Sequence, residues 1–248
     1  MKRFFSILGI LMMELAGLVQ AGPSYSGTLT TADGSLIASG GGWTAPETAP
    51  TSMTWAVTMT WRVTETAPGT WHYQYRLSVP LQSIRRLIIE ASDGTPGPAF
   101  TSANIQSVSG GVWPWISALD PVVTTHQVSP ENPGMPEAMW GMRFDSSLSL
   151  TELELSFDSD RRPVWGDFYA RTDGFICPAT GEWTFPLLDW VRNAGFTIGD
   201  IDPLTGPDAF EWGHLLVPDS ATIPAPEAIV LGGLGLALVG HFRRRRFM

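Results

Sequence analysis

Cysteine is almost absent from this chain, which has one cysteine among its 248 residues. An internal disulfide is therefore excluded. The single residue, Cys177, follows Phe175 and Ile176 and precedes Pro178. We expect a buried, inert thiol or, in an oxidising compartment, a thiol available for pairing with another chain. A cysteine nucleophile would need a partner histidine, and no sequence signature places one beside it.

Lysine is missing from the central part of the chain. Between residues 22 and 223, nine arginines stand against 22 aspartate and glutamate residues, which gives a net charge of −13. Phosphate backbones would repel such a domain, so no nucleic-acid partner is expected. The acidity suits a solvated surface that meets cations or neutral sugars, and it also favours plain solubility.

The motifs of common enzyme classes are also missing. The four histidines, His72, His126, His214 and His241, share no metal-ligand spacing. The chain has no Gly-x-Ser-x-Gly motif, no phosphate-binding glycine loop and no nucleotide fingerprint. No catalytic residue is therefore predicted from a motif.

The N-terminus has the pattern of a secretory signal. Lys2 and Arg3 precede an apolar run over residues 4–13, which continues over 15–19 after Glu14. Ala21 and Val19 then stand at the −1 and −3 positions of a signal-peptidase site. We expect residues 1–21 to be a signal peptide removed by signal peptidase.

The C-terminus combines three features within residues 223–248. A proline-rich box precedes an apolar run over residues 228–242, and an arginine cluster follows. The run would form about 22 Å of helix, short of the roughly 30 Å of a hydrocarbon core. The arginines would hold the end of the chain on the cytoplasmic side. The residues of the box and the cluster are Pro224, Ala225, Pro226, Glu227, Arg243, Arg244, Arg245 and Arg246.

This layout resembles the PEP-CTERM sorting signal, although Ala225 stands where that box usually has Glu, and Glu227 follows. The resemblance implies recognition and cleavage by an exosortase, a membrane protease-transpeptidase. The chain would pass through an intermediate anchored in the inner membrane to the cell surface or the extracellular polysaccharide matrix. A permanent single-span anchor is the alternative. Three further stretches, residues 71–75, 88–93 and 157–170, resemble uncharacterised ectodomains of PEP-CTERM proteins and imply no activity.

The central residues 22–222 predict one all-β ectodomain. Apolar residues alternate with polar ones over residues 55–63 and 71–79, and a turn signal lies at residues 67–69. This pattern predicts an antiparallel hairpin with one buried side. About eight short strands with Gly/Pro-rich joints favour an antiparallel β-sandwich or a jelly roll.

The other predicted elements are shorter. Residues 139–144 and 148–157 predict a second hairpin around Asp145-Ser146-Ser147, with a β-bulge near Thr151–Glu152. A short helix is predicted over residues 187–194. The remaining predicted strands cover residues 25–31, 86–90, 164–170 and 214–217.

Two acidic segments are candidate calcium sites, because calcium prefers oxygen ligands. The first contains Asp158 and Asp160, with Asp167 beyond two arginines, Arg161 and Arg162. The second contains Asp200, Asp202 and Asp208, although Pro203 breaks the EF-hand pattern. A solvated turn with Asp–Arg pairs is the favoured interpretation of the first segment, and calcium binding is the alternative. A carboxylate pair such as Asp158 and Asp167 would suit a glycosidase.

Tryptophan is abundant, with 11 residues. The alternation assigns Trp55, Trp61 and Trp71 to the core. Trp113 and Trp115 flank Pro114 and are candidates for stacking on sugar rings. Core packing is the alternative for them and for the loop tryptophans Trp43, Trp140, Trp183 and Trp212.

Three hypotheses on function follow. The first is a non-enzymatic surface or matrix protein that is adhesive or binds polysaccharide. The second is a secreted glycan-active hydrolase that uses paired Asp or Glu residues. The third is a passive structural component without a ligand.

Overall fold

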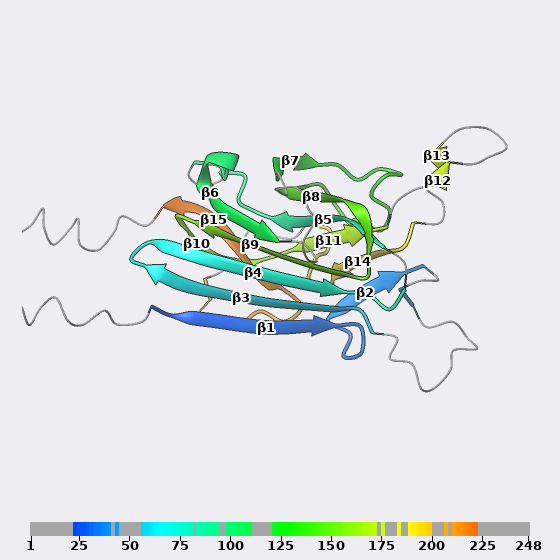
Figure 1. Cartoon of the computed structure of the whole chain (residues 1–248), viewed down its shortest axis with the longest axis horizontal. Coiled ribbons are helices and arrows are strands. Elements are labelled where there is room, and N and C mark those ends of the chain that lie inside the picture. The colour runs from blue at the N-terminus through cyan, green and yellow to red at the C-terminus, as the bar shows by residue number, and fades with distance from the viewer. Residues whose placement is uncertain are drawn as a thin grey trace, which may run out of the picture.

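The computed structural model describes residues 22–40, 43–44, 56–81, 83–94, 98–110, 121–172, 175–176, 183–184, 188–199, 206–207 and 210–222. These residues form an all-β fold in which every strand pair is antiparallel (Figure 1). One 3-10 turn, Ser102–Asn104, precedes β6. Within these ranges no helix is long and apolar enough to cross a membrane. The expected signal peptide, residues 1–21, and the expected sorting signal, residues 223–248, lie outside the described residues.

The first large sheet has five strands in the order β1-β3-β4-β9-β6. Their bounds are β1 Ser24–Thr30, β3 Thr58–Ala67, β4 Thr70–Ser78, β9 Glu152–Ser159 and β6 Ile105–Gly110. The second has six strands in the order β2-β14-β11-β5-β8-β7. Their bounds are β2 Leu36–Ser39, β14 Trp190–Asn193, β11 Phe168–Arg171, β5 Ile84–Glu90, β8 Met139–Leu150 and β7 Val122–His126.

Two smaller pairs complete the described fold. β10 (Arg161–Gly166) pairs with β15 (Leu215–Thr222), and β12 (Phe175–Ile176) pairs with β13 (Trp183–Thr184). The β10-β15 pair is tied to the five-stranded sheet through two buried tyrosines of β4. The hydroxyl of Tyr73 donates to the carbonyl of Arg161 at 2.8 Å, and that of Tyr75 to the carbonyl of Leu216 at 2.7 Å.

One hydrophobic core joins the two large sheets. The five-stranded sheet supplies residues such as Met59, Tyr75 and Phe157, and the six-stranded sheet supplies residues such as Ile89 and Phe168. Each large side chain buried in this way contributes about 1.5–3 kcal/mol to folding. A smaller cluster on the other side of the six-stranded sheet contains Ile88, Met135, Met139, Tyr169 and Phe196.

The hairpin predicted from alternation is confirmed. β3 and β4 pair from Thr58 with Ser78 to Ala67 with Thr70, and the turn contains Gly69 at φ 74°. Trp61 and Trp71 are buried as expected. Trp55 lies outside the described residues. The strand predicted over residues 25–31 is also present, as the edge strand β1.

The predicted second hairpin is wrong. Residues 145–147 continue β8, which ends only at Leu150 and pairs with β5 and β7, whereas β9 begins at Glu152 and pairs with β4 and β6. The change of apolar phase near Thr151 therefore marks a crossing between sheets and not a bulge within one strand. The six-stranded sheet and the five-stranded sheet each bury their own run of apolar residues, which resets the alternation.

The helix predicted over residues 187–194 is also wrong. β14 occupies Trp190–Asn193 and pairs with β2 on one side and β11 on the other. Hydrogen bonding to two neighbouring strands outweighs the weak local preference for helix. The strand predicted over residues 164–170 is divided at Asp167, where β10 ends and β11 begins.

Candidate functional site

A pocket with aromatic walls lies beside the edge strand β1. It has a volume of about 190 Å³, and its lining includes Trp61 of β3, Trp165 of β10 and the segment Phe210–His214 that precedes β15. We call it the aromatic pocket. The carboxylate residues Asp33 and Glu211 also line it. It therefore combines the aromatic side chains and the few polar groups that are typical of small-ligand sites.

The pocket has a buried floor and an exposed rim. Trp61 and Trp165 are buried and meet edge to face, with ring centroids 5.6 Å apart. Phe210 meets Trp165 in the same geometry at 5.9 Å, yet Phe210 is 78% exposed and Trp212 is 58% exposed. Large apolar side chains that stay exposed beside a pocket mark contact sites for ligands or partners.

A glycine in β1 makes room for the floor. A Cβ atom at Gly27 would lie 2.4 Å from Cζ2 of Trp61, so any larger residue would push the indole away. The indole therefore packs directly on the backbone of β1, where it is opposite Gly27 in the strand register. The width of the pocket depends on this close approach.

The carboxylate of Asp33 is fixed by the turn between β1 and β2. Its Oδ1 accepts hydrogen bonds from the Ser35 backbone N–H at 2.8 Å and from the Ser35 hydroxyl at 2.5 Å. The hydrogen bond from the Ser35 side chain, and then that from its backbone, lowers the pKa of Asp33. Asp33 is exposed and stays ionised at neutral pH.

His214 lines the pocket and is held from behind by a buried polar network. Its Nδ1 lies 2.9 Å from Oδ1 of Asp167. Asn193 donates from Nδ2 to the same oxygen at 2.5 Å and to the carbonyl of Gly213 at 2.7 Å. Its Oδ1 accepts from the backbone N–H of Phe168 at 2.9 Å. These contacts satisfy polar groups that would otherwise be costly to bury.

Asp167 is buried at the point where β10 ends and β11 begins. Its backbone N–H donates to Oε2 of the buried Glu90 at 2.5 Å, and its carbonyl accepts from the Glu90 N–H at 3.0 Å. A Cβ atom at Gly166 would lie 2.5 Å from the same Glu90 oxygen, so glycine is needed there. Between β10 and β11, the Glu90 side chain thus accepts the backbone hydrogen bond that a neighbouring strand would otherwise accept.

The first predicted calcium segment has other partners for its carboxylates. Asp158, on the outer side of β9, lies 2.6 Å from Nδ1 of His72. Asp160 accepts from Nδ2 of Asn104 at 3.0 Å and lies 3.7 Å from the Arg161 guanidinium. No group of three or more metal-ligating side chains occurs within the described ranges. Calcium binding stays a prediction.

Asp158 and Asp167, which the sequence suggested as a glycosidase pair, lie in different surroundings. Asp158 is partly exposed and faces His72, whereas Asp167 is buried against His214 and Asn193. The remaining predicted site residues, Asp200, Asp202, Asp208, Trp113 and Trp115, lie outside the described residues, as does Cys177.

Three of the loop tryptophans, Trp43, Trp140 and Trp212, differ in exposure. Trp43 is fully buried, and Trp140 is half-buried with its Nε1–H donating to the carbonyl of Phe100 at 3.2 Å. Core packing explains both. Trp212 is 58% exposed, although the sequence pattern does not separate it from the other loop tryptophans. The available signal is the triplet Phe210-Glu211-Trp212, which stands between the turn residues Pro207 and Gly213 and outside any alternating run.

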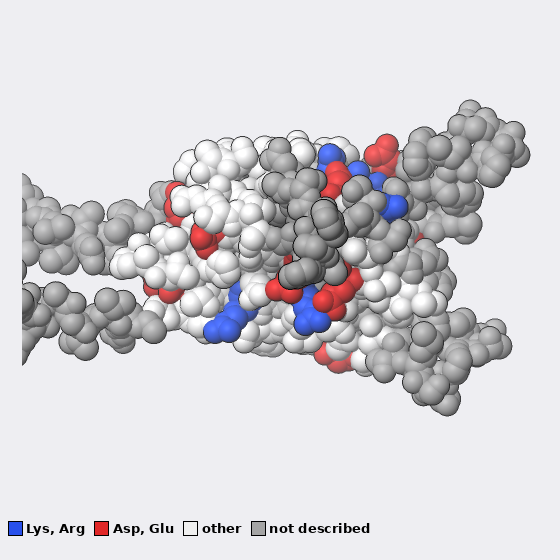
Figure 2. Space-filling view, viewed as in Figure 1, with Lys and Arg blue, Asp and Glu red and all other residues white. Residues whose placement is uncertain are grey.

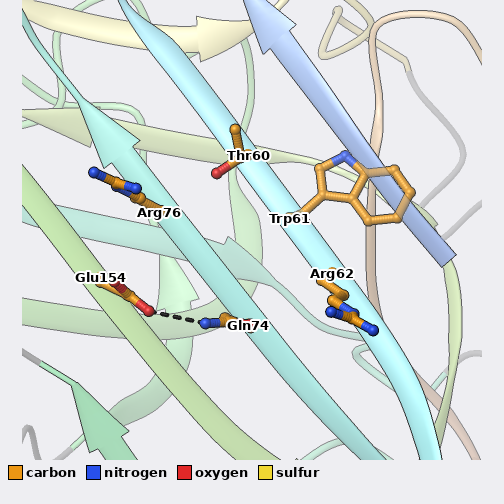
Figure 3. A pocket seen from close by; sticks show the side chains of 6 residues that line it. All are labelled: Thr60, Trp61, Arg62, Gln74, Arg76 and Glu154. Atoms are coloured by element: carbon orange, nitrogen blue, oxygen red, sulfur yellow. Dashed lines mark hydrogen bonds between the residues drawn. The ribbon is translucent and has the colours of Figure 1, made fainter. Parts of the chain in front are cut away.

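A second depression, of about 230 Å³, lies on the outer side of the five-stranded sheet (Figure 3). Its polar side chains come from β3, β4 and β9. Gln74 donates to Glu154 at 2.8 Å, and Arg76 donates to Glu152 at 2.7 Å. The neighbouring Trp61 turns its indole into the core. The polar side chains of this surface pair with one another across neighbouring strands, and the surface offers no exposed aromatic ring. The aromatic pocket is therefore the better candidate site.

Charge is distributed in small groups over the surface. On the side of the molecule seen in Figure 2, acidic and basic side chains lie next to one another at several places. Among the ion pairs of the described residues, the two carboxylate oxygens of Asp145 lie 2.8 Å from Nε of Arg86 and from Nε of Arg143. The described surface in this view therefore shows no broad field of one sign.

Comparison of the chain with family models, with curated proteins and with solved structures finds no match.

Proposed function

We propose that the chain is an exported cell-surface or matrix protein whose ectodomain, a β-sandwich, binds polysaccharide without catalysis. The observation that carries the binding role is the exposed rim of Phe210 and Trp212 above the floor of Trp61 and Trp165. Aromatic rings offer a flat apolar surface on which the apolar side of a sugar ring can pack, while neighbouring carboxylates accept hydrogen bonds from hydroxyl groups. Asp33 and Glu211 provide such acceptors.

Export is supported by the two ends of the sequence. The basic and apolar N-terminus is typical of a signal peptide, and residues 223–248 resemble a PEP-CTERM signal. Processing by signal peptidase and an exosortase would release the domain to the surface or the matrix. Expression in a host with and without its exosortase tests this route, because loss of the enzyme should leave the uncleaved chain in the membrane fraction. Equal cleavage in both hosts would contradict it.

Affinity electrophoresis tests the binding role. The purified chain is run through gels that contain a neutral, an acidic or an amine-bearing polysaccharide, and we expect retardation in at least one of them. Trp212→Ala should abolish most of this retardation, because truncation of an aromatic side chain at the centre of a binding site costs about 2 kcal/mol or more. Ile198→Ala is the matched control, since Ile198 is 81% exposed and does not line the pocket. Equal mobility in all gels would overturn the proposal.

A glycan-active hydrolase is the second candidate, because Asp33 and Glu211 line the same pocket. Paired carboxylates are the usual catalytic groups of glycosidases. Incubation of the chain with the polysaccharide that retards it, followed by measurement of new reducing ends, distinguishes the candidates. Turnover that disappears in Glu211→Gln would establish the hydrolase, and binding without new reducing ends would establish the non-enzymatic role.

A further inference from the structure

The charged groups of the aromatic pocket have one sign. Asp33 and Glu211 both line it, and none of its described lining residues is lysine or arginine. Asp33 is kept ionised by Ser35, which donates two hydrogen bonds to its carboxylate. An anionic ligand, such as a uronic acid, would meet repulsion from both carboxylates, and a cationic ligand would meet attraction.

His214 does not reverse this sign. It is the remaining titratable residue among the described lining residues, and its Nδ1 lies 2.9 Å from the Asp167 carboxylate. A protonated imidazole would therefore form a neutral pair with Asp167, and a neutral imidazole would leave the pair negative. In neither state does this pair carry a positive charge, so the described lining keeps the negative sign of Asp33 and Glu211.

The aromatic rings favour the same ligands. The face of an aromatic ring is the negative side of its quadrupole and attracts ammonium groups, with tryptophan the strongest of the aromatic residues. Two tryptophans of the floor and the exposed Trp212 and Phe210 line this one pocket. Rings beside carboxylates are the combination that recognises organic ammonium groups, which present both apolar surface and positive charge.

We infer that the aromatic pocket recognises an ammonium-bearing ligand and that, within the polysaccharides of the proposed function on which this inference rests, the ligand is an amino sugar with a free amine. A glucosamine unit joins an apolar ring side, which can stack on Trp212, to an ammonium group, which Asp33 and Glu211 attract. Acetylation of the amine removes the charge and leaves the ring unchanged, so it isolates the inferred interaction.

The test compares a glucosamine hexamer with an N-acetylglucosamine hexamer by isothermal titration of the intact chain. We expect the free-amine hexamer to bind about two- to fivefold more tightly, the effect of one cation–π contact at an exposed rim. Glu211→Gln and Asp33→Asn should each reduce this preference. Glu152→Gln is the matched control, because Glu152 lies on the outer side of the five-stranded sheet and pairs with Arg76. Equal affinity for the two hexamers would overturn the inference and leave polysaccharide binding intact.

Tetramethylammonium separates the inference from the proposed function. Quenching of tryptophan fluorescence by this small cation, lost in Trp212→Ala, would support ammonium recognition even if no oligosaccharide bound, and the polysaccharide role would then fail alone. Absence of any effect of the cation, together with tight binding of neutral cello-oligosaccharides, would overturn ammonium recognition and support the proposed function.

Discussion

Nδ1 of His214 lies 2.9 Å from Oδ1 of Asp167, and both residues are buried. The contact joins two segments 47 residues apart in the chain. His214 forms part of the wall of the aromatic pocket, and Asp167 occupies the break between β10 and β11. Asp167 therefore has two structural roles. It contacts a residue of the pocket wall, and it links the β10-β15 pair to the six-stranded sheet.

Asp167→Asn should destabilise the fold. Nδ2 of Asn193 and Nδ1 of His214 both face Oδ1 of Asp167. An amide keeps one such oxygen, but it replaces the second oxygen with an NH2 donor inside this buried network. We expect the free energy of unfolding to fall by about 1–3 kcal/mol, measured by urea denaturation. The control is Asp160→Asn, whose side chain is 44% exposed and can keep the hydrogen bond from Asn104. Equal losses in the two variants would contradict a special role for the buried network.

Gly27→Ala should both destabilise the fold and distort the aromatic pocket. The new Cβ would lie 2.4 Å from the Trp61 indole, so the ring or the edge strand must move. Overpacking of this kind costs about 1–3 kcal/mol. Chemical denaturation measures the loss, and a shift of the tryptophan emission maximum reports the displaced ring. Gly206→Ala is the control, because a Cβ there meets nothing within 4 Å. An unchanged emission spectrum in Gly27→Ala would count against the predicted close packing.

The sequence predicted the fold best where a strand buries one side. The alternation in residues 55–63 and 71–79 led directly to β3 and β4, because each of these strands has one apolar side towards the core. β5 shows why other strands were less clear. Leu87 and Ile89 enter the main core while Ile88 enters the smaller cluster, so the strand is buried on both sides and loses its alternation. The change of apolar phase near Thr151 led to the wrong prediction of a hairpin, because such a change does not show which strands pair.

The aromatic pocket was not predictable from local patterns. Its residues come from β1, the β1–β2 turn, β3, β10 and the segment before β15, and only long-range pairing brings them together. Trp61 was correctly assigned to the core, but its second role as the floor of a pocket depends on Gly27 across the strand pair. Asp167 was expected in a solvated turn, and its burial depends on Glu90, Asn193 and His214 from three other parts of the chain.

Tyrosine ionisation should be coupled to unfolding. Burial raises the pKa of Tyr73 and Tyr75 well above the ordinary value of 10, and it also raises the pKa of Tyr169. The unfolded chain therefore loses protons near pH 10 that the folded chain retains, so stability is complete below that pH and falls above it. Three of the four tyrosines should ionise only as the protein unfolds. Absorbance at the phenolate band, recorded together with circular dichroism, checks this. Full ionisation at pH 10–11 with the dichroism unchanged would contradict the burial of these rings.

Tyr75→Phe should weaken the attachment of the β10-β15 pair to the five-stranded sheet. The variant removes the donor for the Leu216 carbonyl and leaves that buried oxygen with one partner fewer. Loss of such a hydrogen bond costs about 1–2 kcal/mol, and the ring still packs against Phe157. Hydrogen exchange measures the effect locally, and amides of β15 should exchange faster than those of β8. Uniform acceleration over both sheets would show that the hydroxyl stabilises the whole fold and not this attachment.

His126 should make stability depend on pH on the acidic side. Its buried ring faces the Gly141 carbonyl at 3.1 Å, and burial, with smaller contributions from Arg143 and Arg86, lowers its pKa below the ordinary value of 6.5. The unfolded chain therefore binds a proton at His126 near pH 6.5, whereas the folded chain binds it only at a lower pH. The resulting stabilisation is complete above that pH and is lost progressively as the pH falls below it.

His126→Gln isolates this effect, because glutamine can donate to the Gly141 carbonyl but does not titrate. Urea denaturation between pH 5 and 8 gives the free energy of unfolding of each protein. The difference between the two proteins removes the contributions of the other histidines, which both share. We expect this difference to favour the histidine protein most at pH 8 and least at pH 5. A difference that is constant over this range would show that His126 titrates alike in the folded and unfolded chain, and the ring would then be open to water.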